Sequence, residues 1–351
     1  MATNICRTLI IIFAVLCGVV TKAYAVGEGR LLFVNKDTGR VVGAGIDKNG
    51  NFHSAFDVII PSQKGKDTII PTTSGFVLYS YFNGGAQAYL MDGNGSIRPG
   101  ANSYPWSKQW YDRVSVGDFI LLYNLNGNQG VGAIVQANPD GSLPQTYTKT
   151  NFSPWTLVGH TNNDLFFYNK PNGLSVIATI SSTGQLYQNT TAVTLRAGYT
   201  NFASVGDDII VWNVFNGLWE SGSITYDALP ANDKYVAATV ATTNSLGLVG
   251  FDEAVEQNGH LLLYNSATGA AVTGHFIRPA QFGGQPGTFV KDQSLVLPKY
   301  FTDLVQCGQF LVFYGFGVGQ LQIGYIDFAG KYQPTQSFPM GAGLSVAATK
   351  N

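Results

Sequence analysis

The chain has 351 residues, and its 20 lysines and arginines nearly balance its 21 aspartates and glutamates. This balance excludes the basic surface that binds nucleic acid. Charged residues make up only 12% of the chain and apolar residues 45%, which excludes wholesale disorder. Glycine is abundant, at 42 residues, and aromatic residues reach 13%. This composition favours many short strands joined by tight turns over a helical protein.

The first 25 residues have the pattern of a secretory signal peptide. Arg7 precedes an apolar run over residues 9–20, and the small residues Ala23 and Ala25 stand where a cleavage site requires them. That run is too short to span a membrane comfortably, and no later stretch is long and apolar enough, so we expect no membrane insertion. The sequence predicts a signal peptide over residues 1–25 and one domain over residues 26–351. We expect that domain to be secreted or extracellular, or periplasmic in a bacterium.

An apolar run that usually ends in an aromatic residue recurs seven times along the remaining chain. We call the last residue of each run the anchor, and the anchors are Val34, Tyr79, Tyr123, Tyr168, Trp212, Tyr264 and Tyr314. Successive anchors are 45, 44, 45, 44, 52 and 50 residues apart. A glycine follows six of the anchors by five residues, and Asn-Gly at this place is a strong hairpin signal. A second aromatic precedes five of the anchors by thirteen residues: Trp110, Trp155, Tyr199, Phe251 and Phe301.

Each repeat predicts four short strands, with the anchor at the end of the second. Seven four-stranded units of this length are typical of a seven-bladed β-propeller, so the predicted fold is all-β. The chain enters the first unit at its anchor strand, which leaves that unit without its leading strand. We predict that the C-terminal segment, Gly343 to Ala347, supplies this strand. Pairing of the N- and C-terminal strands would then close the ring and remove an open sheet edge.

Reactive groups in a recognisable spacing are scarce. The four histidines, His53, His160, His260 and His275, show no His-x-x-x-His or Cys/His spacing, and we place them in different repeats at unrelated positions. The sequence therefore predicts no zinc site and no cofactor.

Two acidic pairs are the candidates for acid–base chemistry. Asp207-Asp208 precedes an anchor strand and fits a turn, and Asp252-Glu253 follows a leading aromatic. Alternation along a strand would direct Asp252 and Glu253 to opposite faces. A glycosidase needs two converging carboxylates, and sequence alone leaves open whether different blades bring two together. No catalytic residue is assigned.

Aromatic side chains are the candidates for ligand binding. Trp106, Trp219 and Tyr300 lie out of register with the repeat, on links or turns that the strand order predicts to share one face. Exposed aromatics on loops are typical of recognition sites. The candidate list is completed by residues beside or at the leading positions: Tyr111, Trp110 and Trp155. The periodicity of the last two also fits a core role.

The repeat style resembles that of secreted propeller lectins of the tachylectin-like and related bacterial seven-bladed kinds. It consists of an aromatic-led strand, an apolar strand that ends in Tyr-Asn, and a glycine turn, as in Leu165-Phe166-Phe167-Tyr168-Asn169. The resemblance implies a non-catalytic protein that binds glycans or cell-surface glycoconjugates at several weak sites, and it assigns no residue. Two alternatives remain open: a scaffold or adhesin that binds an extracellular protein, and a glycan-cleaving hydrolase or lyase with a carboxylate pair in its central pocket.

Overall fold

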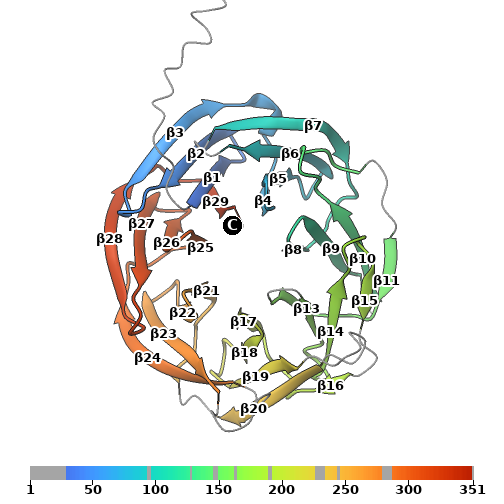
Figure 1. Cartoon of the computed structure of the whole chain (residues 1–351), viewed down its shortest axis with the longest axis vertical. Coiled ribbons are helices and arrows are strands. Elements are labelled where there is room, and N and C mark those ends of the chain that lie inside the picture. Colours follow the sequence, from blue (N-terminus) through green and yellow to red (C-terminus); the bar gives the residue numbers. More distant parts are fainter. Residues whose placement is uncertain are drawn as a thin grey trace, which may run out of the picture.

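The computed structural model describes residues 29–92, 96–126, 129–144, 149–161, 164–188, 192–225, 234–242, 246–278 and 287–349. The predicted signal peptide, residues 1–25, lies outside this part of the chain. Within it, seven antiparallel sheets stand around a central axis (Figure 1). The predicted all-β, seven-bladed propeller is therefore confirmed. Helical structure among the described residues is limited to the short 3-10 helix η1 (Pro61–Gln63), and none of their helices is long and apolar enough to cross a membrane.

Each blade is a sheet whose strands follow one another from the axis outwards. The first three blades are β29 (Ser345–Ala348), β1 (Gly29–Asn35), β2 (Arg40–Ile46), β3 (Phe52–Ile59); β4 (Thr68–Pro71), β5 (Gly75–Tyr79), β6 (Gly85–Met91), β7 (Ile97–Pro105); and β8 (Asp112–Val116), β9 (Phe119–Asn126), β10 (Gln129–Gln136), β11 (Lys149–Phe152). The fourth is β12 (Leu157–His160), β13 (Asp164–Tyr168), β14 (Leu174–Ile180), β15 (Leu186–Gln188), with β16 (Val193–Thr194) also beside β14. The last three are β17 (Asn201–Val205), β18 (Asp208–Trp212), β19 (Trp219–Thr225), β20 (Lys234–Thr242); β21 (Glu253–Gln257), β22 (His260–Tyr264), β23 (Ala270–Ile277), β24 (Thr288–Val296); and β25 (Asp303–Cys307), β26 (Phe310–Gly315), β27 (Gln320–Ile326), β28 (Tyr332–Pro339).

The two ends of the described chain meet in the first blade. Strand β29 pairs antiparallel with β1, with Ala348 opposite Leu31 and Ser345 opposite Val34. The C-terminal strand is thus the innermost strand of a blade whose other three strands are N-terminal. The predicted closure of the ring is confirmed.

The anchor strands are apolar throughout because neighbouring blades cover both of their faces. On β9, Ile120 and Leu122 pack with the second blade, whereas Leu121 and Tyr123 pack with the fourth. A strand that alternates between two buried interfaces needs apolar residues at every position. The core of the protein therefore consists of seven interfaces between blades, and the anchor runs supply the centre of each.

Where the anchor is a tyrosine, in five of the seven blades, its hydroxyl bridges the blade to the next one. In the third blade, the Tyr123 hydroxyl accepts a hydrogen bond from the Trp155 backbone N–H at 2.8 Å and lies 3.0 Å from the Trp155 carbonyl, to which it can donate. The backbone N–H of the leading residue makes the same bond to the preceding anchor at four other junctions: Trp110 to Tyr79, Tyr199 to Tyr168, Phe301 to Tyr264 and Leu344 to Tyr314. We call this contact the tyrosine bridge.

The leading aromatics stand two residues before the inner strands. The sequence analysis predicted that they lie within those strands. Trp155, for example, precedes β12, which begins at Leu157. Their side chains are buried between blades, which confirms the core role considered for Trp110 and Trp155. The backbone N–H of a leading residue donates to the tyrosine of the preceding blade, so this residue does not take part in the sheet hydrogen bonds of its own blade.

Deletion of residues 341–351 tests the closure of the ring. The deletion removes β29 together with Leu344 and Val346, which are buried in the core beside Leu31. Loss of one large buried aliphatic side chain costs about 2–5 kcal/mol, so we expect the free energy of unfolding to fall by at least about 3 kcal/mol. Urea denaturation monitored by circular dichroism measures this, with deletion of residues 350–351 as the control. A truncated protein that unfolds at the same urea concentration as the full chain would contradict the closure.

The substitution Tyr123→Phe tests the tyrosine bridge. It removes one hydroxyl and leaves the Ser153 carbonyl, 2.8 Å away in the same turn, as the remaining acceptor of the Trp155 backbone N–H. One intramolecular hydrogen bond contributes about 0.5–1.5 kcal/mol, so the free energy of unfolding should fall by about that amount. Tyr325→Phe, at a partly exposed position, is the matched control and should change stability by less than about 0.5 kcal/mol. Equal effects of the two substitutions would show that the bridge does not stabilise the ring.

Candidate functional site

The inner strands all begin on one side of the ring, which we call the crossover face. It carries the links from each outer strand to the next inner strand and the turns between the second and third strands. In each blade, the residue opposite the anchor is the first residue of the inner strand. These seven residues form what we call the inner ring: Thr68, Asp112, Leu157, Asn201, Glu253, Asp303 and Ser345. All seven are half-buried, and three of them carry carboxyl groups.

Two of the acidic residues of the inner ring belong to neighbouring blades. Glu253 begins β21, Asp303 begins β25, and these two inner strands lie side by side. Burial raises the pKa of Glu253 to about 7, and the negative charges of Asp252 and Asp303 add to this effect. Burial also raises the pKa of Asp303 to about 6, against the opposing effect of a hydrogen bond from Thr302. Both carboxyl groups therefore change protonation state near neutral pH.

The carboxyl group of Asp252 lies next to Glu253 in the sequence but differs from it in exposure and in hydrogen bonding. One carboxylate oxygen of Asp252 accepts a hydrogen bond from the Ser266 backbone N–H at 2.8 Å, and the other accepts from the Ser266 hydroxyl. Asp252 is exposed and Glu253 is half-buried. Asp252 precedes β21 and Glu253 begins it, so the two carboxyl groups occupy different environments although they are adjacent in the sequence. The carboxyl group of Asp252 is hydrogen-bonded to a turn, whereas that of Glu253 is half-buried beside the next inner strand.

A pocket of about 340 Å³ opens on the crossover face between the second and third blades. It is lined by five residues from the ends of β4 and β8 and from the turn after β5: Asp67, Thr68, Tyr81, Tyr111 and Arg113. The Arg113 guanidinium donates to the Trp110 carbonyl at 2.6 Å. Burial lowers the pKa of Arg113, and the charges of Asp67 and Asp112 act against this effect. Arginine is always charged in proteins, so the pocket presents one cation, the carboxyl group of Asp67 and two phenol rings.

The pocket tyrosines are held against each other. The rings of Tyr81 and Tyr111 meet edge to face with their centres 5.2 Å apart. The Tyr81 backbone N–H donates to the Asp67 carboxylate at 3.0 Å, which fixes the turn to the start of β4. This wall is a preformed aromatic surface of the kind that stacks on a sugar ring.

The structure divides the aromatic candidates of the sequence analysis into two groups. Tyr111 is 63% exposed and Tyr300 is 57% exposed, and both stand on the crossover face just before an inner strand. The expectation that Trp106 and Trp219 are exposed is wrong, because both are buried. Each fills space between blades, Trp106 beside Tyr79 and Trp219 in the interface between the fifth and sixth blades. All four tryptophans among the ligand-binding candidates are thus buried and contribute to packing: Trp106, Trp110, Trp155 and Trp219.

The sequence analysis did not assign the acidic residues of the inner ring to a site. A signal for them existed, because six of the seven inner-ring residues stand eleven residues before an anchor. That position holds Asp112, Glu253 and Asp303 in three repeats. The repeats themselves therefore mark one position that carries acidic residues in three blades, two of them neighbours.

The inner ring supplies acid–base chemistry, and the pocket supplies a cation and aromatic surface. Two carboxyl groups with pKa values near 6 and 7 can act together, one as base and one as acid, at neutral pH. Such raised pKa values cluster at functional sites. The acidic pair and the pocket lie on opposite sides of the central axis, at β21 and β25 and at β4 and β8 (Figure 1).

No family model matches the sequence, and a search of curated proteins finds no match. Solved structures share the fold over most of the chain. The periplasmic gluconolactonase PpgL of Pseudomonas aeruginosa is 11% identical, covers 92% of this chain and 99% of its own, and gives a TM-score of 0.66. A Bacteroides uniformis protein, described as an unconfirmed 6-phosphogluconolactonase, is 13% identical, with coverages of 91% and 99% and a TM-score of 0.66. At these identities the likeness shows the fold alone.

The substitution Asp252→Asn tests the electrostatics of the acidic pair. Asparagine keeps an oxygen for the Ser266 N–H but removes the negative charge that helps to raise the pKa of Glu253. We expect the pKa of Glu253 to fall from about 7 towards the ordinary range of a glutamate. Carbon-13 NMR of the side-chain carboxyl groups across a pH titration measures it, with Glu256 at the far end of the same strand as the internal reference. A pKa of Glu253 that stays the same or rises would contradict this account.

Proposed function

We propose that the protein is a hydrolase that opens a sugar-derived lactone at the crossover face. The observation that carries this proposal is the acidic pair, Glu253 and Asp303, with pKa values of about 7 and 6 on adjacent inner strands. Structures of the same fold that bear gluconolactonase names support the choice of substrate class. The non-catalytic lectin favoured by the sequence analysis loses support, because Trp106 and Trp219 are buried.

The two carboxyl groups have the protonation states that lactone hydrolysis requires. Between pH 6 and 7, Asp303 is mostly ionised and Glu253 is mostly protonated. Asp303 would take a proton from a water molecule as its oxygen attacks the lactone carbonyl carbon. Glu253 would then give its proton to the ring oxygen as the carbon–oxygen bond breaks. The product is the open-chain hydroxy acid, and the proton passes from Asp303 back to Glu253 through solvent.

The pocket on the other side of the axis would bind a polar or anionic part of the substrate. Arg113 suits a carboxylate or another anion, and the Tyr111 ring suits the C–H face of a sugar. The pocket of about 340 Å³ is within the size range of sites for small ligands. Tyr300 stays a candidate for the same stacking role next to Asp303. We keep these binding roles within the proposal, separate from the acid–base roles.

A location outside the cytoplasm is part of the proposal. It rests on the signal peptide predicted over residues 1–25, and the periplasmic gluconolactonase of the same fold is consistent with it. A lactonase in this location would act on sugar lactones formed outside the cell or released into the periplasm.

Hydrolysis of glucono-δ-lactone and related aldonolactones, followed by proton release in a pH-stat, tests the function. We expect Glu253→Gln and Asp303→Asn each to lower kcat/KM by about 100-fold or more, as for loss of a general acid or base. The activity should rise with pH through about 6, as Asp303 ionises, and fall through about 7, as Glu253 loses its proton.

The matched control is Glu256→Gln, which neutralises a carboxyl group at the opposite end of the same inner strand. This variant should keep the full activity. Two results would contradict the proposal: lactone hydrolysis that survives both substitutions in the acidic pair, or retention of glycans on an array by a protein that opens no lactone. The second result would restore the lectin hypothesis.

A further inference from the structure

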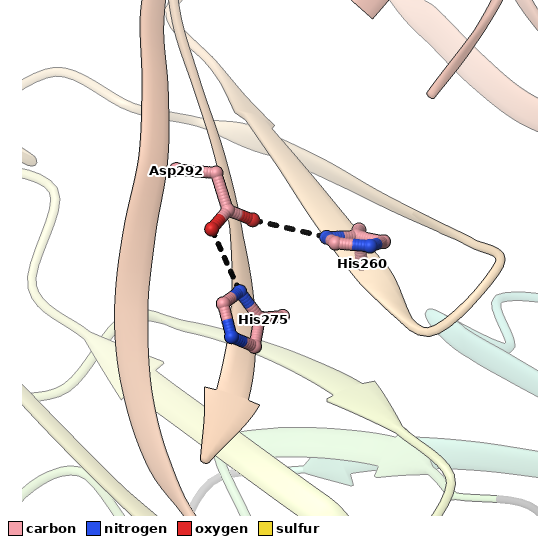
Figure 2. A group of neighbouring side chains, drawn as sticks. All are labelled: His260, His275 and Asp292. Carbon is pink, nitrogen blue, oxygen red and sulfur yellow. Dashed lines mark hydrogen bonds and ion pairs between the residues drawn. The ribbon is translucent and has the colours of Figure 1, made fainter. Parts of the chain in front are cut away.

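Three potential metal ligands come together in the sixth blade, on the side of the ring opposite the crossover face. His260 is the first residue of β22, and His275 lies directly opposite it on β23. Asp292, on β24, reaches between the two imidazole rings (Figure 2). The sequence analysis assigned these two histidines to unrelated positions, and this assignment is wrong. The two strands that follow the Asn258-Gly259 turn bring them together.

A β-bulge places the carboxylate between the rings. Strand β23 pairs Thr273 with Gln293 and Gly274 with Lys291, so Asp292 is the extra residue of β24. A bulge redirects the side chain of the extra residue, and bulges are frequent beside functional sites. The Asp292 oxygens lie 3.0 Å from Nδ1 of His260 and 2.7 Å from Nδ1 of His275. Both imidazoles therefore present the same nitrogen to one carboxylate, as Figure 2 shows.

The neighbouring blade forms a wall behind the carboxylate and leaves the other side accessible. Gly330, in the turn before β28, adopts a φ of +76°, and a Cβ at this position would lie only 2.3 Å from Oδ2 of Asp292. The Thr273 hydroxyl donates to the Gly330 carbonyl and ties this turn to the sixth blade. The side chains of His260 and Asp292 are 12% and 11% exposed, whereas that of His275 is 35% exposed. An ion can therefore enter on the His275 side.

We propose that His260, His275 and Asp292 bind a divalent transition metal ion, with zinc as the best match. Two imidazole nitrogens and one carboxylate oxygen are the donor set that zinc accepts, and three protein ligands leave a fourth position for water or another ligand. The three ligand atoms lie within 4.8 Å of one another. Ligand atoms around tetrahedral zinc are about 3.4 Å apart, because each lies about 2.1 Å from the ion. Small side-chain movements therefore complete the site.

The seventh blade shows that these donors are not required by the fold. The seventh blade has a bulge at the same place, between Ile323 and Gly324, opposite Thr335. At the three equivalent positions it carries residues that bind no metal: Phe310, Tyr325 and Thr335. The rings of Phe310 and Tyr325 pack edge to face there. Hydrophobic packing thus satisfies this corner of a blade, and the replacement of all three residues by metal-binding types points to a ligand.

The metal site is separate from the acidic pair and does not depend on the proposed lactone hydrolysis. The inner strand β21 begins at Glu253 on the crossover face and ends at Gln257, and the turn to His260 follows on the opposite face. The ion would therefore bind at the far end of the sixth blade. Its role would be to clamp β22, β23 and β24 together or to recruit a ligand at its fourth position.

Zinc titration of untagged, chelator-treated protein tests the site. Competition with a chromophoric chelator should show one zinc ion per chain, and Co²⁺ should give the visible absorption bands of a four-coordinate site. Loss of a residue that merely orients a ligand weakens metal binding by 10–100-fold, so His275→Gln and Asp292→Asn should each weaken it by about 100-fold or more. Bound zinc should also raise the Tm of the wild-type protein and of neither variant.

His53→Ala is the matched control, because His53 also lies beside a carboxylate, with Nε2 3.1 Å from Asp47, but in the first blade. It should bind zinc as tightly as the wild-type protein. The proposal is overturned if the wild-type protein binds no zinc, if the Asp292 and His275 variants bind it equally well, or if the His53 variant loses it. Circular dichroism of each variant separates loss of the site from loss of the fold.

Discussion

The tyrosine bridge is the interaction on which the geometry of the ring depends. At five of the seven junctions between blades, the backbone N–H of the residue that leads into the inner strand lies in a buried interface, where a polar group needs a hydrogen-bond partner. The anchor hydroxyl supplies that partner from the preceding blade, as Tyr79 does for Trp110. In the fifth blade the anchor is a tryptophan, and the direction of the bond changes: the Trp212 indole N–H donates to the Phe251 carbonyl at 2.8 Å. In these six blades a polar atom at the anchor is bonded to the residue that leads into the next inner strand, whereas the anchor of the first blade, Val34, contributes apolar packing alone.

The same register places the candidate active site. Because each inner strand begins opposite an anchor, its first residue always occupies the same height on the crossover face, as Glu253 does opposite Tyr264 and Asp303 opposite Tyr314. The surrounding blades remove water from this position, which is why burial is the main cause of the raised pKa of both carboxyl groups. The blades thus hold the position rigidly, whereas its side chain varies from repeat to repeat. Chemistry can change at this ring of positions without a change of fold.

The fold could be predicted from the sequence because the same pattern of strands and turns recurs in all seven repeats. Anchor spacing gave the blade number, and the incomplete first repeat gave the closure. The side chains were harder to place. Trp106 and Trp219 lie outside the periodic pattern, so sequence gave no sign that the interfaces between blades need their volume. The pairing of His260 with His275 could have been found, since hairpin register follows from the turn between them. The contribution of Asp292 could not, because a bulge shifts the register by one residue and no local motif marks it.

The sixth blade shows how a repeat can gain a site without disturbing the ring. Its third strand, β23, ends at Ile277, and its fourth strand, β24, begins at Thr288. In the seventh blade the third strand ends at Ile326, and the fourth begins after a shorter connection, at Tyr332. Extra residues between two strands cost little, because the entropy of closing a loop grows slowly with its length. The inner and anchor strands, which carry the tyrosine bridge, keep their ordinary lengths in both blades. The bulge at Asp292 lies on the outer strand β24, and His260 is the one residue of the three that lies on an anchor strand, so the site adds to the blade without a change in the strands that form the tyrosine bridge.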